Sequence, residues 1–158
     1  MSLPTLGWLL TLGVVLHNTE EALYLPAWST LAGKWYRPIA ARTFRIAIIL
    51  FSGIILFLTA LTSHSASNGA AAYIMAGYVL AMVLNALFPH VLATLVSGRY
   101  MPGTATALLL NAPLGLLYLH QALAQHRIDL HTFLWTGPAI VLAIVMILPL
   151  LFAIGRKL

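Results

Sequence analysis

The chain has 158 residues, of which 61% are hydrophobic and 7% are Asp, Glu, Lys or Arg, and its formal net charge is +5. An ordinary soluble domain carries about 25% charged residues, so this composition excludes a soluble globular protein and predicts an integral membrane protein. Cysteine is absent, which excludes disulfides and thiolate metal ligands, and the acidic residues are Glu20, Glu21 and Asp129.

Five apolar segments are each long enough to cross the hydrocarbon core of a bilayer as a helix, which takes about 20 residues. The connections between them contain proline, glycine or clusters of polar residues, which break helices. The predicted fold is therefore all-α: a single domain over residues 1–158, built as a bundle of five transmembrane helices. The expected spans are approximately residues 3–24, 44–62, 71–96, 104–121 and 133–154.

Basic residues are distributed unevenly between the two ends of these spans. All except Arg127 fall in or beside the first connection, in the third connection, or at the C-terminus (Lys34, Arg37, Arg42, Arg45, Arg99, Arg156, Lys157). The positive-inside rule makes that side cytoplasmic, so we expect an N-out, C-in protein. Contact with anionic lipid headgroups accounts for the net charge, and no nucleic acid partner is needed.

The first segment runs inward and carries three ionisable residues in its cytoplasmic half. Glu20 and Glu21 lie three and four positions after His17, so both carboxylates flank the imidazole on one face of a helix. A charged side chain in hydrocarbon costs about 2.5–3.5 kcal/mol on insertion scales, and ionisable residues within spans usually mark function. No Lys or Arg is expected at that depth to form an ordinary salt bridge.

The third and fourth segments bring further polar residues to the same level. His90 lies roughly 10 Å from the cytoplasmic end, by helical rise, and Thr94 continues its face. Pro89 cannot donate to the carbonyl of Asn85, so we expect a kink there; on an ideal helix Asn85 would face elsewhere, and only the kink allows it to take part. In the fourth segment, Thr104 and Asn111 recur at near-helical spacing, with Asn111 at the matching depth.

Two imidazoles and a carboxylate are typical of catalytic zinc sites and of the two-histidine, one-carboxylate sites of non-haem iron. We therefore predict that a divalent metal, zinc or iron, is bound by His17, His90 and one of the glutamates, with Glu21 favoured. The other glutamate would act as a general base, so both Glu20 and Glu21 are candidate catalytic residues. Asn85, Thr94, Thr104 and Asn111 would orient water or substrate.

Three functions remain open on this basis. The leading hypothesis is a metal-dependent membrane enzyme that hydrolyses or oxidises a lipid or another hydrophobic small molecule. The same residues could instead form the relay of an ion or proton-coupled transporter, or a structural network in an accessory subunit. A homodimer would double the number of ligands and allow a dinuclear site. The outer histidines are read as solvated loop residues or as a metal-capture site (His64, His120, His126, His131).

Three stretches resemble a known family: HNTEEALYLPAW, NALFPH and PGTATA. Together they resemble the HXXEE family of small bacterial membrane proteins, over approximately residues 14–115. The resemblance implies a shared site that includes His17, Glu20 and Glu21, with Asn85, His90 and the Pro102–Gly103 turn as secondary signatures. It also implies a multi-pass protein of the bacterial cytoplasmic membrane, and it implies no particular activity.

Overall fold

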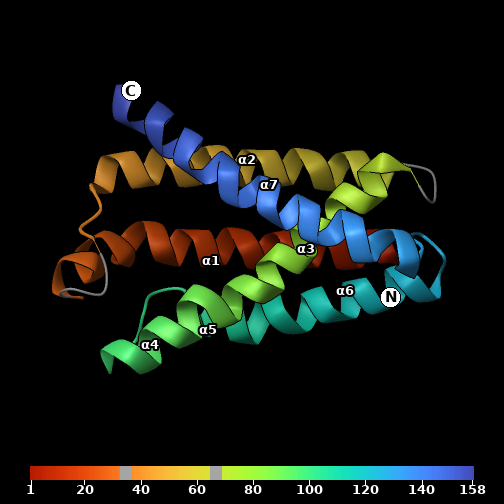
Figure 1. Cartoon of the computed structure of the whole chain (residues 1–158), viewed down its shortest axis with the longest axis horizontal. Helices are drawn as coiled ribbons and strands as arrows, with labels where there is room; N and C mark the ends of the chain where they lie inside the picture. The colour runs from red at the N-terminus through yellow and green to blue at the C-terminus, as the bar shows by residue number, and fades with distance from the viewer. Residues whose placement is uncertain (33–36, 65–68) are drawn as a thin grey trace.

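The computed structural model describes residues 1–32, 37–64 and 69–158, and within these ranges its regular structure is entirely helical. The described helices form five rods, which run along the bundle (Figure 1). Three are continuous helices: α1 (Leu3–Leu31), α2 (Ala41–Ser63) and α7 (Leu130–Lys157). The other two each contain a π-helical segment. One consists of α3 (Ala70–Asn85), π-helical Ala86–Val91 and α4 (Leu92–Ser97); the other of α5 (Thr104–Thr106), π-helical Ala107–Asn111 and α6 (Ala112–Ala124). The all-α prediction is confirmed.

Among the described residues, four helices are long and apolar enough to cross a membrane, at Ala41–Ser63, Ala70–Ser97, Thr104–Ala124 and Leu130–Lys157. They coincide with the last four predicted spans, and each is a few residues longer than expected. The helix α1 has 29 residues, about 43 Å by helical rise, but polar residues from His17 to Glu21 lower its hydropathy. It packs between α2 and α6 (Figure 1). The chain is thus a helical membrane protein in which the helix that carries these polar residues packs against apolar helices and also has an exposed apolar face.

The first helix does not end near Tyr24, as the proline after it suggested, but continues through Pro26 to Leu31. Proline lacks an N–H group, so the carbonyl of Ala22 loses its intrahelical partner. Arg45 of α2 donates to that carbonyl from Nε at 3.0 Å. A neighbouring helix thereby satisfies the freed oxygen, and the helix can continue beyond the proline.

The third rod bends at the expected place. Phe88 has φ −130° and ψ 118°, an extended conformation that a following proline imposes on the residue before it. The π-helical turn and Pro89 redirect the chain, so that α4 diverges from the C-terminal half of α7 (Figure 1). On the other side of the kink, α3 and α7 pack closely: a Cβ at Gly77 would lie 2.6 Å from Cβ of Ile140.

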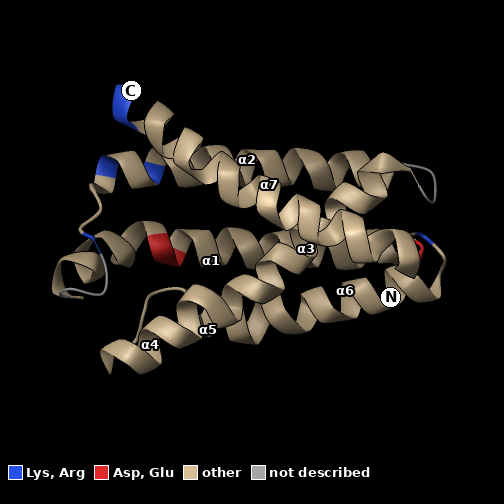
Figure 2. Ribbon diagram, viewed as in Figure 1, with Lys and Arg blue, Asp and Glu red and all other residues tan. Residues whose placement is uncertain are grey.

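Most charged residues lie toward the two ends of the bundle, and a red band on α1 lies within it (Figure 2). The acidic residues of α1 are Glu20 and Glu21. Most of the described Lys and Arg lie at the end where α1 finishes and α2 begins, and Arg127 lies at the other end. Arg45 reaches the carbonyl of Ala22, beside Glu21, so the expectation that no Lys or Arg lies at the depth of the glutamates is wrong; this arginine bonds the backbone of α1.

Two hydrogen bonds connect segments at the end where α1 finishes. Arg42 of α2 donates to the carbonyl of Leu158, and Arg99 donates to the carbonyl of Leu31. Lys34, which the sequence assigned to the same side, lies outside the described residues.

Candidate metal centre

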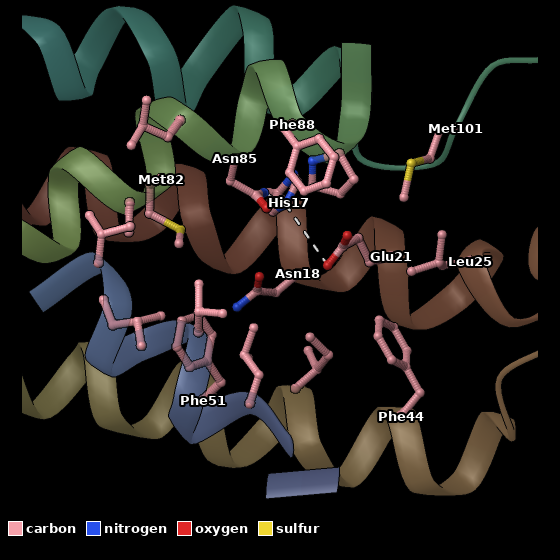
Figure 3. A pocket seen from close by; sticks show the side chains of 18 of the residues that line it. His17, Asn18, Glu21, Leu25, Phe44, Phe51, Met82, Asn85, Phe88 and Met101 are labelled. Carbon is pink, nitrogen blue, oxygen red and sulfur yellow. Dashed lines mark hydrogen bonds and ion pairs between the residues drawn. The ribbon is translucent and has the colours of Figure 1, made fainter. Parts of the chain in front are cut away.

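Three side chains from two rods converge inside the bundle: His17 and Glu21 from α1, and His90 from the π-helical segment after α3. We refer to them as the triad. One nitrogen or oxygen atom of each lies within 4.8 Å of the others. Glu21 is close to both imidazoles, with Oε2 3.9 Å from His17 Nε2 and Oε1 3.3 Å from His90 Nε2. Figure 3 shows His17 and Glu21 side by side on α1. The predicted ligand set is therefore brought together.

The hydrogen bonds of His17 orient one ring nitrogen toward the triad. Its Nδ1 lies 3.1 Å from the carbonyl oxygen of Gly103 and 3.2 Å from Oγ1 of Thr106. A carbonyl can only accept, and Thr106 has acceptors of its own for its single proton, so Nδ1 is the nitrogen that carries hydrogen. The lone pair is then on Nε2, which faces Glu21. Histidines that bind metals through Nε2 commonly donate their other N–H to a backbone carbonyl in this way.

His90 is completely buried, with 0% of its surface exposed. Among the described residues, neither of its ring nitrogens has a hydrogen-bond partner; Nε2 is close to Glu21 Oε1, but the geometry is not that of a hydrogen bond. An unsatisfied buried polar group costs roughly 1–3 kcal/mol, and such groups are rare in folded proteins. A ligand at Nε2 would remove part of that cost.

Gly103 allows the two imidazoles to pack against one loop. Its φ is +93°, a left-handed conformation that favours glycine. A Cβ at this position would lie 2.6 Å from Cε1 of His90, 2.8 Å from Cε1 of His17 and 3.1 Å from Cγ of Glu21. The two rings themselves pack edge to face, with centroids 4.7 Å apart. The Pro102–Gly103 turn is therefore part of the site through its backbone, since it contacts all three triad residues.

Asn85 contacts His17 of the triad because of the π-helical turn. Its Nδ2 lies 3.3 Å from Nε2 of His17, consistent with an amide that donates to the free lone pair of the ring. On an α-helix, Asn85 and His90, five residues apart, would point in different directions. A π-helical turn bonds residues five apart, so both side chains reach α1. Proline at position 89 indicates the kink, but the sequence does not reveal the π-helical geometry.

Glu20 is held apart from the triad by two hydroxyl groups. Tyr100 donates to its Oε1 at 2.6 Å, and Thr106 donates to its Oε2 at 2.8 Å. Partial burial and the hydrogen bond to Glu20 raise the pKa of the Tyr100 phenol, which keeps it a donor. Thr106 contacts both Glu20 and His17, so it links the second glutamate to the first ligand. The sequence analysis missed Tyr100 and Thr106, because residues on a loop and at the start of another rod carry no periodic signal.

The remaining predicted polar residues lie beside the triad rather than in it. The hydroxyl groups of Thr94 and Thr104 are 3.0 Å apart, and each also bonds the backbone of Met101. These contacts hold the loop that contains Gly103. Asn111 is fully buried, and its Oδ1 lies 3.2 Å from where a Cβ of Gly13 would be, one turn from His17. Its amide has no hydrogen-bond partner among the described residues.

A cavity of about 560 Å³ opens from one side of the triad. His17, Glu21 and Asn85 line it, together with Asn18, whose Nδ2 donates to Ser52 Oγ at 2.9 Å. Its other walls are apolar side chains from every rod except the one that contains α6, and Figure 3 shows several of them around Glu21. We call this space the apolar cavity. It gives the triad a hydrophobic chamber within the size range of small-molecule sites.

The outer histidines are not part of a comparable cluster. His64, His120, His126 and His131 are all exposed at the opposite end of the bundle. Within the described ranges, the triad is the one group of three potential ligands whose atoms lie close enough to hold a metal ion together.

Comparison with known proteins agrees with the sequence motifs. A family described as "Protein of unknown function with HXXEE motif" matches residues 8–118, which contain the triad, Glu20 and Thr106. The uncharacterized protein YrkK of Bacillus subtilis (strain 168) is 33% identical over 145 residues, which cover 91% of each chain. No solved structure matches this chain.

Proposed function

The chain belongs to the HXXEE family, and we propose that it is a metal-dependent membrane enzyme that hydrolyses or oxidises a lipid-soluble substrate. One observation carries the proposal: a buried set of two histidines and a carboxylate borders a largely apolar cavity. Two imidazoles and a carboxylate leave further coordination positions for water or substrate in both zinc and non-haem iron sites.

The spacing of the triad fits a small divalent cation. Zinc ligands lie about 2.0–2.2 Å from the metal, so their atoms are roughly 3.3–3.6 Å apart in a tetrahedron. The two distances from Glu21 to the imidazoles, 3.3 and 3.9 Å, lie near this range. These two distances involve different oxygens of Glu21, and single ligand atoms of the three residues lie within 4.8 Å of one another, so side-chain shifts of up to about 1 Å would bring them to zinc-ligand spacing. The metal would take the Nε2 lone pair of His17, so the hydrogen bond from Asn85 to that nitrogen would be broken.

A bound metal would supply a Lewis acid and, in the case of zinc, a hydroxide near neutral pH. His17, His90 and Glu21 would hold it. Glu21 is also the carboxylate that lines the cavity, so it is the group able to take a proton there. Asn85 would orient water or substrate through its amide. Glu20 is 2.8 Å from Thr106, which contacts His17, so its role in this proposal is to position that ligand.

The proposal also specifies how the chain is oriented in the membrane. We infer five spans with the N-terminus outside and the C-terminus inside the bacterial cytoplasmic membrane, because most of the described basic residues lie toward one end of the bundle. The triad then lies in the cytoplasmic half of the bilayer, and basic residues at that end contact anionic headgroups.

Elemental analysis of detergent-purified protein tests the proposal. Wild-type protein, expressed with zinc and iron in the medium, should carry a stoichiometric divalent metal. His17→Ala and His90→Ala should lose it, while the matched control His120→Ala, which removes an exposed histidine on α6, should retain it. Wild-type protein without stoichiometric metal would overturn the proposal. Ion flux in liposomes that Glu21→Gln abolishes would favour the transporter instead.

A further inference from the structure

We propose that the apolar cavity binds a single unbranched hydrocarbon chain, which enters sideways from the bilayer and presents its reactive head group to His17 and Glu21. The inference rests on the proposed function and specifies its substrate class. It commits to a membrane-resident lipid with one chain, such as a fatty alcohol, aldehyde or ester, and it is carried by the shape, polarity and opening of the cavity.

The residues that line the apolar cavity extend along the helices. Its lining residues on α7 extend from Val141 to Phe152, about 16 Å by helical rise, and those on α2 extend from Phe44 to Phe51, about 10 Å. These lining residues recur every three or four positions, so each helix presents one continuous apolar stripe to the space. An extended hydrocarbon chain can lie along these stripes. We refer to the part of the apolar cavity that they border as the slot.

Polar groups occupy one wall of the slot. They belong to His17, Asn18, Glu21 and Asn85, which lie on α1 and at the end of α3. Asn18 is already engaged with Ser52. Lys and Arg are absent from the described lining, so a polar or anionic molecule would find no counter-charge along the length of the slot. A molecule with one polar end and an apolar tail matches this distribution.

The opening of the cavity faces the membrane. Leu87, Phe88 and Val145 line the cavity and are 59%, 70% and 57% exposed, whereas the lining residues of α2 at Phe44 and Phe51 are buried. These exposed residues lie on the two rods that diverge after the kink, the α3–α4 rod and α7 (Figure 1). An opening between two helices of spanning length, within the apolar part of both, is bordered by lipid in a membrane, so hydrocarbon chains can reach it directly.

The end of the cavity toward the basic residues is closed by apolar side chains. Leu25 and Met101 are 2% and 0% exposed, and together with Phe44 they form one buried cluster that also includes Trp28. Met101 lies on the same loop as Gly103, so this wall belongs to the structure that supports the triad. A water-soluble substrate would have to displace these residues to enter from that side, whereas a lipid would not.

Photo-crosslinking tests the inference. The probe is a long-chain fatty alcohol with a diazirine in the middle of its chain and a terminal alkyne for detection, added to the protein in lipid nanodiscs. Peptide mapping of wild-type protein should locate the crosslinks on the α2 and α7 stripes. Ile144→Trp, which fills the slot, should reduce labelling at least several-fold. Met146→Trp should not, because Met146 is on the same helix, 77% exposed and outside the lining.

Metal content measured on the same samples separates this inference from the proposed function. If Ile144→Trp keeps its metal but loses the crosslinks, both are supported. If Ile144→Trp retains its metal and is labelled as strongly as wild type, the proposed hydrocarbon-chain site is overturned, but the proposed metal-dependent enzyme is not. Wild-type protein that crosslinks in the slot but holds no metal overturns the enzyme alone. If Ile144→Trp does not fold, Ala81→Leu, a smaller filling of the same slot, gives the same comparison.

Discussion

A substitution at Thr106 tests whether hydrogen bonds to the ring of His17 strengthen metal binding. Thr106→Val keeps the shape of the side chain and removes the hydroxyl that bridges Glu20 and His17. Nδ1 of His17 then retains one acceptor, the carbonyl of Gly103 at 3.1 Å, and loses the other at 3.2 Å. Loss of such supporting partners typically weakens metal binding 10- to 100-fold. Because one acceptor remains, we expect about a tenfold rise in the dissociation constant of zinc, or about 1.4 kcal/mol.

The assay is a competition titration of metal-stripped protein against a fluorescent zinc chelator in detergent. Thr19→Val is the matched control, because Thr19 is on the same helix as His17, is exposed, and bonds only the carbonyl of Val15, at 2.7 Å. Nitrogen NMR of isotopically labelled histidine reports which ring nitrogen of His17 carries hydrogen. Unchanged zinc affinity in a folded Thr106→Val protein would refute the argument that this hydroxyl helps to set the ring.

Two further predictions concern the loops. Gly103→Ala should abolish metal binding and lower the melting temperature, because its Cβ would meet both triad imidazoles at under 3.0 Å. Gly98→Ala is the control: it has a similar positive φ of +64° but no atom within 4 Å, so metal content should be kept. At the start of α7, hydrogen bonds from Thr132 lower the pKa of Asp129. Thermal unfolding should find Asp129→Ala less stable than wild type above the ordinary aspartate pKa of about 3.9, with the difference vanishing as the pH falls through the lowered value. A difference that persists in acid would contradict this origin.

Composition and local spacing determined much of this protein in advance. Apolar segments of spanning length specify the helices, because a backbone in hydrocarbon must satisfy its hydrogen bonds within each helix. The i, i+4 spacing of His17 and Glu21 places both on one face of α1 whatever the rest of the chain does. His90 was matched to them by depth alone, since helical rise converts position in a span into position in the membrane. The scarcity of charge made these three residues stand out.

Tertiary structure decided which polar residues meet. The two adjacent glutamates look equivalent in the sequence, yet Glu21 faces the imidazoles while Glu20 bonds Tyr100 and Thr106, because neighbouring positions on a helix point about 100° apart toward different rods. The π-helical turn that brings Asn85 to His17 depends on how a kinked helix packs. The cavity arises where α7 and the α3–α4 rod diverge. Such features depend on contacts between segments distant in the chain, and no local pattern encodes them.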